Sequence, residues 1–547
     1  MNLKNSSVFS ASWLFWAKFL CSILFIFWSL SFIQHSSIVL KNGTRYYHLF
    51  DDAMISMRYA WNFAHGEGLT WNTNYSPVEG YSNPLMVFLM ASVIKVLEDK
   101  SLSCLGIQLL GIIFVLSVSF LAAQLTQRLL PLYPQTTVSP QLFVFLAFFF
   151  TLTAYPLLYY SLMGMENGLL ALLLMLALNC IFQDKKNPSL FFIVPGLLAL
   201  MMLTRPDAII AVLPIFLFYL YEHRLGSKKK WIASILIFLV PLFLLVLFRW
   251  LYYKQWIPNT ALLKLGVPFQ LRWPEGWLYS QKTIQHIFGI VPCIFIGISV
   301  LGKPDRRKML LFSFFPLLIT YQLWTGGDCF QTQRFPSHFL GVFFVLLIVA
   351  IFEGIHWLNA HLFIQSSLKR WGSPVFVFLS IGFLVWSFQT YFFSLANFIV
   401  SKPFPNSYYE WEEENLIQHK TNLKISLAVK DATLSPKITM GVLWAGMTYY
   451  AETNGVDFLG KCDPYIASLP PNPGVFSPGH SKYNLLWSTS FYLPDVIYTN
   501  SWTTEFEKMF RDHPELYQKY QDFRLFYLKS NSPYLDSNKF LQQILFY

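Results

Sequence analysis

The chain has 547 residues, of which 54% are hydrophobic, 18% aromatic and only 13% charged, and its mean hydropathy is +0.43. This balance excludes a soluble globular protein, because soluble domains carry about 25% charged residues. The net charge of +11 would suit a nucleic-acid-binding protein, but the positive-inside rule of membrane proteins explains it without nucleic acid.

The apolar residues are gathered into segments that predict a polytopic membrane protein. A membrane-spanning helix needs about 20 mostly apolar residues. Eleven candidate segments occur, several of them short: 19–39, 104–126, 141–158, 167–183, 189–203, 207–221, 231–252, 284–301, 309–324, 337–356 and 374–398. The first is long and has no small-residue cleavage site behind it, so we expect a retained anchor.

The distribution of cations predicts the orientation of these helices. With the N-terminus in the cytoplasm, the inner loops hold three acids, Asp184, Glu222 and Asp305. They hold fifteen cations: Lys4, Lys18, Arg128, Lys185, Lys186, Arg224, Lys228, Lys229, Lys230, Lys303, Arg306, Arg307, Lys308, Lys369 and Arg370. This excess matches the positive-inside rule. It requires that the weak apolar stretch 84–98 does not cross, and we expect that stretch to be a helix at the outer interface.

The first outer loop, residues 40–103, contains two adjacent acids, Asp51 and Asp52. Apolar and polar residues at helical spacing follow them, which predicts a short helix that ends before Gly66 and Gly68. Both acids then lie in its first turn, where the helix dipole favours negative charge. A capping pair on a surface helix would give the same pattern, but the position directly after a predicted span favours a functional site.

A second polar feature is the tip of a predicted hairpin, Thr204-Arg205-Pro206-Asp207, whose arms are 189–203 and 207–221. Arms of about fifteen residues reach about 22 Å, less than the roughly 30 Å hydrocarbon core. The tip is therefore expected to be sunk below the outer surface, in a cavity. Charged residues at that depth indicate either function or a structural pair between Arg205 and Asp207.

Other outer loops add polar candidates. The loop 253–282 is long enough to be a lid or a binding segment, and the segment 326–335 begins with two glycines. In the second segment, Asp328 and Arg334 either pair with each other or belong to a site. The candidates from all these outer loops are Glu79, Glu166, Asn259, Lys264, Arg272, Asp328 and Arg334.

The composition changes after residue 401. Residues 402–547 are rich in Tyr, Asn, Pro and Ser, and the short apolar runs 438–444 and 495–498 are typical of strands. We therefore expect a transmembrane domain over 1–401 and a soluble mixed α/β domain over 402–547 on the outer side. Six cysteines occur singly, which indicates no metal site, and a disulfide between Cys329 and Cys462 is left open.

A deep outer cavity with acids and cations beside the bilayer suits a substrate with a lipid tail, a phosphate and a polar head. Transfer of a lipid-phosphate-linked sugar needs one carboxylate as general base. It needs no matched acid, because phosphate leaves as a stable anion, whereas glycoside hydrolysis uses two carboxyl groups. Cations would neutralise the departing phosphate, and the available ones are Arg58, Arg205, Lys264, Arg272 and Arg334.

Motifs spread over nearly the whole chain carry a family resemblance. They are Asp51-Asp52-Ala53 with Arg58, Tyr59 and Asn62; Gly66 and Gly68; Val78-Glu79-Gly80-Tyr81-Ser82-Asn83-Pro84-Leu85; Gly164-Met165-Glu166; Leu203-Thr204-Arg205-Pro206; Pro258-Asn259-Thr260 with Lys264; Gly326-Gly327-Asp328 with Arg334 and Phe335; Asp457, Gly460, Asp463, Ile466 and Ala467; and Pro478-Gly479-His480 with Lys482 and Tyr483. Together they resemble the GT-C membrane glycosyltransferases, and among these the mycobacterial terminal arabinofuranosyltransferase and its bacterial relatives. The resemblance implies a polyprenyl-phosphate sugar donor, reaction on the non-cytoplasmic face, inversion at the anomeric carbon, and an acid of the first loop as base.

The resemblance also implies roles for single residues. It favours Asp51 as general base and Asp52 as its partner, whereas the residues alone rank neither, since neighbours on a helix point about 100° apart. Arg205, Lys264 and Arg334 would bind the donor phosphate, and Arg58 would bind it or orient the acids. The rest of the expected site comprises the cavity residues Glu79, Glu166, Asp207, Asn259 and Asp328 and the acceptor-binding residues His480 and Lys482.

The soluble domain is expected to hold the acceptor and to contribute no catalytic group. No cofactor or metal is expected, although Asp52 would accept a divalent cation where one is present. The chain is rich in Phe, Lys, Ser and Asn where a mycobacterial protein would be rich in Ala. An envelope glycan or lipopolysaccharide of a Gram-negative bacterium is therefore the expected acceptor, and its inner membrane the expected location, with the active site and the soluble domain in the periplasm.

Two other classes of protein fit part of the pattern. A transporter or flippase of a lipid-linked or anionic substrate would also have many helices and buried charges, but no repeat relates the two halves of this chain and the outer domain is large. A carbohydrate-binding membrane protein without catalysis is disfavoured, because both acids of the first motif are present.

Overall fold

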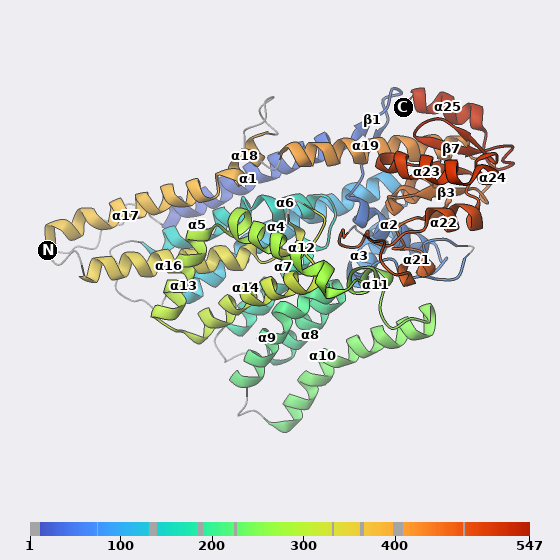
Figure 1. The fold of residues 1–547 in the computed structure, drawn as a ribbon. Helices are drawn as coiled ribbons and strands as arrows, with labels where there is room; N and C mark the ends of the chain where they lie inside the picture. The colour runs from blue at the N-terminus through green and yellow to red at the C-terminus, as the bar shows by residue number, and fades with distance from the viewer. Residues whose placement is uncertain are drawn as a thin grey trace.

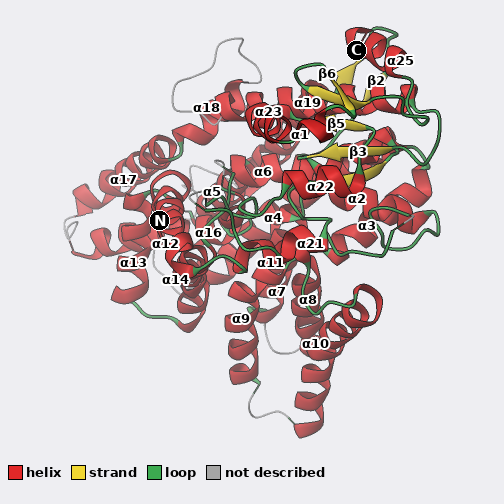
Figure 2. Cartoon of the chain, turned by 45° about the vertical axis from the view of Figure 1, so that its right-hand side comes forward, coloured by secondary structure: helices red, strands yellow, loops and turns green. Residues whose placement is uncertain are grey.

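The computed structural model describes residues 11–73, 75–130, 139–183, 190–223, 227–330, 333–361, 366–397, 409–473 and 476–546. Within these ranges most residues are helical, and a five-stranded sheet lies at one end of the molecule (Figures 1 and 2). The predicted domain boundary at 401 lies outside the described residues. So do five residues of the charge pattern: Lys4, Asp184, Lys185, Lys186 and Arg224.

The predicted helical membrane architecture is confirmed, since each of the eleven apolar segments is helical where it is described. The helices are α1 (Ala11–Ser36), α4 (Lys100–Leu129), α5 (Pro140–Leu152), α6 (Tyr155–Leu162), α7 (Asn167–Ile181), α8 (Leu190–Thr204), α9 (Ile209–Glu222), α10 (Lys228–Phe248), α13 (Ile290–Gly302), α14 (Arg306–Thr325), α16 (Leu340–His361), α17 (Ser366–Ser387) and α18 (Gln389–Asn397).

Length and composition identify four described helices that could cross a membrane, or seven if each of three bent helix pairs counts as one span. The multi-pass character is therefore clear, whereas the further crossings in the shorter helices stay a prediction. One bent pair turns by 84° at Gly289, whose φ of +78° favours glycine. Helix α16 is central, with 78% of its apolar window buried, whereas α10, with 11% buried, diverges from the bundle (Figure 1).

The short hairpin and the outer loops have the predicted positions. Helices α8 and α9 have 15 and 14 residues and are joined by the 3-10 turn η2 (Pro206–Ala208), which contains the expected tip. The loop expected over 253–282 is mostly helical, with α11 (Asn259–Leu265) and α12 (Phe269–Lys282), because its polar and aromatic residues recur at helical spacing. A single turn, α15 (Arg334–Ser337), precedes α16.

The C-terminal part is the expected mixed α/β domain. Its sheet has the order β4-β3-β5-β7-β6, in which β4, β3 and β5 are parallel and the other two pairings are antiparallel. The runs expected at 438–444 and 495–498 form β3 and β5. The domain's elements are α19 (Tyr409–Ala432), β3 (Thr439–Val442), η5 (Ala445–Met447), α20 (Thr448–Ala451), β4 (Asn454–Asp457), α21 (Pro464–Ser468), α22 (Leu485–Tyr492), β5 (Val496–Tyr498), η6 (Asn500–Trp502), α23 (Thr503–Asp512), α24 (Pro514–Tyr517), β6 (Tyr520–Asp522), β7 (Phe526–Lys529) and α25 (Ser537–Phe546).

The first outer loop lies between the membrane helices and this domain. After the short strands β1 (Ile38–Val39) and β2 (Arg45–Tyr46), it forms α2 (Asp51–Ala64), which starts at the two acids as predicted, and α3 (Pro84–Leu97). Gly66 and Gly68, with φ of +85° and +81°, follow α2 and turn the chain. Asn72 exchanges two hydrogen bonds of 2.8 Å with the backbone of Gly455 in β4. The predicted domains therefore share an interface built on this loop.

Candidate active site

A cavity of about 420 Å³ lies where α2, the α8–α9 hairpin, α11 and the soluble domain meet. Apolar side chains form part of its wall, among them Ile209, Leu263 and Phe335. Four acids and five cations also line it: Asp52, Glu166, Asp207 and Asp328, and Arg205, Arg249, Lys264, Arg334 and Lys461. The cavity thus combines a greasy surface with a dense charge cluster, as the sequence predicts.

Asp52 occupies the centre of this charge cluster. Its Oδ1 accepts a hydrogen bond from Lys461 Nζ at 2.7 Å, and its Oδ2 accepts one from Arg334 Nη1 at 2.8 Å. Burial alone would raise the pKa of Asp52, but the charges of Lys461 and Arg334 hold it well below its usual value. The carboxylate is therefore ionised at neutral pH, and 23% of its side chain remains exposed towards the cavity.

Arg334 connects Asp52 to a second acid. Its Nε donates to Asp328 Oδ2 at 3.0 Å, and Lys264 Nζ lies 3.6 Å from Asp328 Oδ1. The predicted pairing of Asp328 with Arg334 is present, and both residues also line the cavity. Gly327 makes this arrangement possible, because its φ is +77° and a Cβ there would lie 2.6 Å from Tyr279 Cβ.

The hairpin tip forms a neighbouring ion-pair group. Arg205 donates to both oxygens of Asp207, at 2.7 and 3.0 Å, and also to Glu166 Oε1. Asn83 Nδ2 donates to the other oxygen of Glu166 at 2.8 Å. The structural pair anticipated between Arg205 and Asp207 is therefore present, on the wall of the cavity. Because Arg205 already contacts two acids, it is the cation least available to a further anion.

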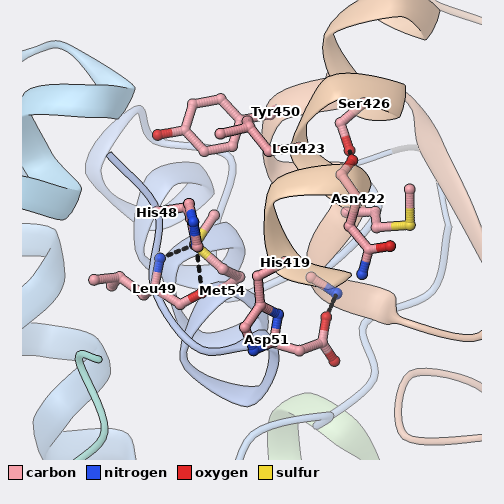
Figure 3. Close-up of a pocket in the computed structure, with 11 residues that line it drawn as sticks. His48, Leu49, Asp51, Met54, His419, Asn422, Leu423, Ser426 and Tyr450 are labelled. Atoms are coloured by element: carbon pink, nitrogen blue, oxygen red, sulfur yellow. Dashed lines mark hydrogen bonds between the residues drawn. The ribbon is translucent and has the colours of Figure 1, made fainter. Parts of the chain in front are cut away.

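Asp51 lies on the other side of α2, away from the cavity. Its Oδ1 accepts a hydrogen bond of 3.1 Å from the Gly446 backbone N–H, and its buried Oδ2 has no partner among the described residues. It lines a separate pocket of about 30 Å³ with His48 and His419 (Figure 3). Burial raises the pKa of Asp51 to about 7. The placement corrects the expectation that Asp51 faces the substrate, because successive helix residues point in different directions.

Four more predicted site residues lie outside the cavity lining, because their polar atoms already have structural roles or are buried elsewhere. Arg58 donates to the backbone carbonyls of three residues, Trp71, Thr448 and Thr453, and so ties α2 to the soluble domain. Lys482 donates to two backbone carbonyls, of Leu262 and Ala467. Glu79 pairs with Arg249 at 2.9 Å, and Asn259 is fully buried. These placements correct the expected phosphate role of Arg58 and the expected acceptor role of Lys482.

His480 is the soluble-domain residue whose predicted position in the site agrees with the structure. It follows the Pro478-Gly479 turn and lines the cavity opposite the charge cluster. Burial lowers the pKa of His480 to about 4, so its ring is neutral at neutral pH and offers one donor and one acceptor. Its role in binding an acceptor stays a prediction.

Sequence reasoning missed two cations of the cavity. Arg249 ends the apolar segment 231–252, where a charge at a helix end resembles an interfacial anchor. Lys461 belongs to the motif that begins at Asp457, but nothing in the spacing shows that it reaches an acid more than 400 positions earlier, at Asp52. A cation inside an otherwise buried motif was the available signal.

The cysteines and possible metal ligands add no further group to the site. Cys329 lines the cavity, Cys462 is buried, and both are free thiols in the structure. Among the described residues no cluster of three or more His, Cys, Asp or Glu side chains could hold a metal ion. Whether the protein uses a divalent cation stays a prediction.

Comparison with known proteins gives weak likenesses. No family model matches the chain, and no curated protein matches it. ArnT from Cupriavidus metallidurans bound to undecaprenyl phosphate aligns with a TM-score of 0.48 and 12% identity, over 82% of this chain and 86% of that chain. The Archaeoglobus fulgidus oligosaccharyltransferase in the apo form aligns with a TM-score of 0.48 and 9% identity, over 96% and 75%. Scores this low identify no function, so the function is inferred below from this chain's own residues.

Proposed function

We propose that this protein is an inverting glycosyltransferase of the GT-C type. It moves a sugar from a polyprenyl-phosphate donor to an envelope glycan or lipopolysaccharide on the periplasmic face of a bacterial inner membrane. The observation that carries the proposal is the grouping of one ionised carboxylate, Asp52, with Lys264, Arg334 and Lys461 in a cavity that also has an apolar wall. The motif resemblance supports the GT-C type and the arabinofuranosyltransferase-like branch.

Asp52 is the acid best placed to act as general base. In the proposed step it takes the proton of an acceptor hydroxyl, whose oxygen forms a bond to the anomeric carbon from the face opposite the phosphate. The bond between that carbon and the phosphate oxygen breaks, and the phosphate leaves with the electron pair. No general acid is needed, because the leaving group is already an anion.

The paired cations around Asp52 have a consequence for its strength as a base. Lys461 and Arg334 keep the pKa of Asp52 low in the free protein, so on its own the carboxylate is a poor proton acceptor. A donor phosphate that enters the cavity adds negative charge and competes for the same cations. Its arrival therefore raises the basicity of Asp52 when the donor is in place.

The same contacts rank the candidates for the phosphate site. Lys264 has one ion pair, at 3.6 Å from Asp328, and its flexible side chain can turn towards an entering anion. Arg334 presents a planar guanidinium that suits two phosphate oxygens, although it already bridges two acids. Arg205 is held by Glu166 and Asp207, and in this proposal it shapes the cavity without direct phosphate binding.

The lipid tail would follow the apolar side of the cavity. Ile209 at the start of α9, Ile257 before α11 and Leu265 at its end line this side. Ile209 and Ile257 are also substantially exposed, which suits contact with lipid. A chain that enters along this wall brings its phosphate to Lys264, at the boundary between the apolar wall and the charge cluster.

The test uses the purified full chain in lipid nanodiscs with a polyprenyl-phosphate-linked sugar and envelope glycan from a strain that lacks this gene. Wild-type protein is expected to yield sugar-modified glycan with inverted anomeric configuration, and Asp52→Asn protein is expected to yield none. A comparison of envelope glycans from the deletion strain and the wild type identifies the sugar and the acceptor. An unchanged glycan, together with translocation of the lipid across vesicles without product, would establish the transporter alternative.

A further inference from the structure

Two neighbouring parallel strands of the soluble domain end at the acid pair of α2. The segment after β3 places the Gly446 N–H 3.1 Å from Asp51 Oδ1. The segment after β4 places Lys461 Nζ 2.7 Å from Asp52 Oδ1. In α/β domains, the carboxyl ends of parallel strands are the edge at which ligands bind. In this protein that edge holds two side chains of the transmembrane domain.

The loop that carries Lys461 is rigidly built. The buried Asp457 accepts hydrogen bonds from the backbone N–H groups of Leu459 at 2.9 Å and Cys462 at 2.7 Å. Gly460 has a φ of +80°, and a Cβ there would lie 2.8 Å from Ile466 Cγ2. These contacts fix the backbone on both sides of Lys461, so its side chain starts from a defined point at the edge of the cavity.

The position of this loop depends on the docking of the domain against α2. Arg58 donates to the carbonyls of Thr448 and Thr453, at 3.2 and 3.1 Å, on the segment between β3 and β4. Gly446 packs so closely on α2 that a Cβ there would lie 2.6 Å from Asp51 Oδ1 and 2.7 Å from Met54 Cβ. The interface is therefore tight enough to set the distance between Lys461 and Asp52.

We propose that the soluble domain completes the active site by placing Lys461 on the Asp52 carboxylate, so that docking of the domain holds this acid ionised and turned towards the cavity. Lys461 is then a positioning residue, and the domain does more than hold an acceptor. The inference deepens the proposed function and rests on it for its catalytic meaning, whereas the contact itself is independent of the substrate.

The other groups around Asp52 do not replace Lys461. Arg334 on α15 is the second cation on the carboxylate, and Asp328 and Asp51 add negative charge nearby. The remaining titratable neighbours are Cys329, His480 and His419, which burial keeps neutral at neutral pH. Loss of Lys461 would leave one cation against three acids, and the carboxyl group of Asp52 would take up a proton at a higher pH.

The test measures the protonation of Asp52 directly, in the full chain in nanodiscs and without substrate. Infrared difference spectra between each protein and its Asp52→Asn counterpart report the carboxylate band as pH is lowered. The variants are Lys461→Met, Lys461→Arg and, as matched control, Lys430→Met, which removes an exposed 2.8 Å ion pair with Glu452 in the same domain. We expect Lys461→Met to move the titration of Asp52 upward by about one to three pH units. Lys461→Arg and Lys430→Met should leave it near the wild-type position.

An unmoved titration in Lys461→Met protein with a wild-type unfolding midpoint overturns the inference. If that variant does not fold, Lys461→Gln in the same measurement decides the question with a polar side chain of similar length. Transfer assays then separate the two proposals. A shifted titration in a protein whose wild type transfers no sugar would leave this inference standing and reject the function. Active wild type with the same acid limb of the pH–rate profile in Lys461→Met would reject the inference alone.

Discussion

Asp51 and Asp52 are adjacent in the chain, but their carboxyl groups have opposite electrostatic surroundings. Asp52 faces the cavity between two cations, whereas Asp51 faces a small closed pocket between two buried histidines. Desolvation dominates at Asp51 and ion pairing at Asp52, so the pKa of Asp51 is raised and that of Asp52 is lowered. The two acids therefore have different roles, and each role leads to its own prediction.

Asp52→Asn should nearly abolish sugar transfer, by about 10² to 10⁴-fold, because removal of a general base has this effect. Asp51→Asn keeps an acceptor oxygen for the Gly446 N–H and should reduce transfer far less. Turnover of both purified variants with excess donor is the measurement. Equal loss in both variants, with intact folding, would contradict the assignment of the base to the cavity-facing acid.

The pH dependence of stability should identify Asp51 as a buried acid. Its pKa is about 7 in the folded chain and near 3.8 in an unfolded one. The folded state therefore binds the proton more tightly, and stability falls as pH rises between these values. The full effect is up to about 4 kcal/mol. Asp51→Asn should match the wild-type unfolding midpoint at about pH 4 and exceed it at about pH 8. A lower midpoint for the variant at both pH values would contradict this.

Lys264 and Arg334 should differ in what their removal does. Each loses a charge-assisted hydrogen bond to phosphate worth about 1.5–3 kcal/mol, which is about 10- to 150-fold in donor affinity. Lys264→Ala should show this loss with unchanged stability, because its one ion pair is long. Arg334→Ala should also lower the unfolding midpoint, because it leaves Asp328 buried with only Lys264. Donor titration and thermal unfolding of both variants test this, and unaltered donor affinity in both would refute the phosphate site.

At the scale of elements, the position of α2 follows from its contacts on two sides. Its first turn provides the acids, and its middle is fastened to the soluble domain by Arg58, which contacts backbone in the first loop and in the segment from Thr448 to Thr453. A buried guanidinium that satisfies three carbonyl groups is a structural fastener, because truncation leaves each acceptor without its donor.

Arg58→Ala should therefore destabilise the docked domain, by about 1–3 kcal/mol for each buried carbonyl left without a partner. Faster hydrogen exchange in α2 and α20, together with easier proteolysis around the soluble domain, is the expected result. The matched control is Arg45→Ala in the same loop, where the arginine is exposed. Normal exchange in the Arg58 variant, with reduced donor affinity, would restore the phosphate role that the sequence suggested.

At the scale of the whole molecule, the proposed reaction requires the cavity and the soluble domain to face the same side of the membrane. We expect Cys329, which lines the cavity and is exposed, to react with a membrane-impermeant maleimide added to the periplasmic side. Cysteines introduced at Lys228 and Arg307 should react only from the cytoplasmic side. A cavity labelled from the cytoplasm would sink the donor proposal, because it places the lipid-linked sugar on the outer face.

The sequence by itself determined the features that depend on local pattern. Apolar segments determined the helices, alternating apolar runs the strands β3 and β5, and the short arms around Arg205 the sunken tip of the hairpin. Helix and strand periods and segment lengths are properties of a few consecutive residues, so the order of the chain contains them. The same reasoning placed Asp328, Arg334 and His480 near one another on the outer side.

Only the tertiary structure decided which of these side chains face the cavity. A rotation of about 100° separates Asp51 from Asp52 on α2, and the packing of α2 selects the one that meets Lys461. The same packing turns Arg58 and Lys482 into backbone fasteners and brings Lys461 to an acid in the other domain. Side-chain direction and long-range pairing depend on how elements dock. Docking is set by the summed shape and charge of many residues far apart in the chain, and a local pattern does not contain that sum.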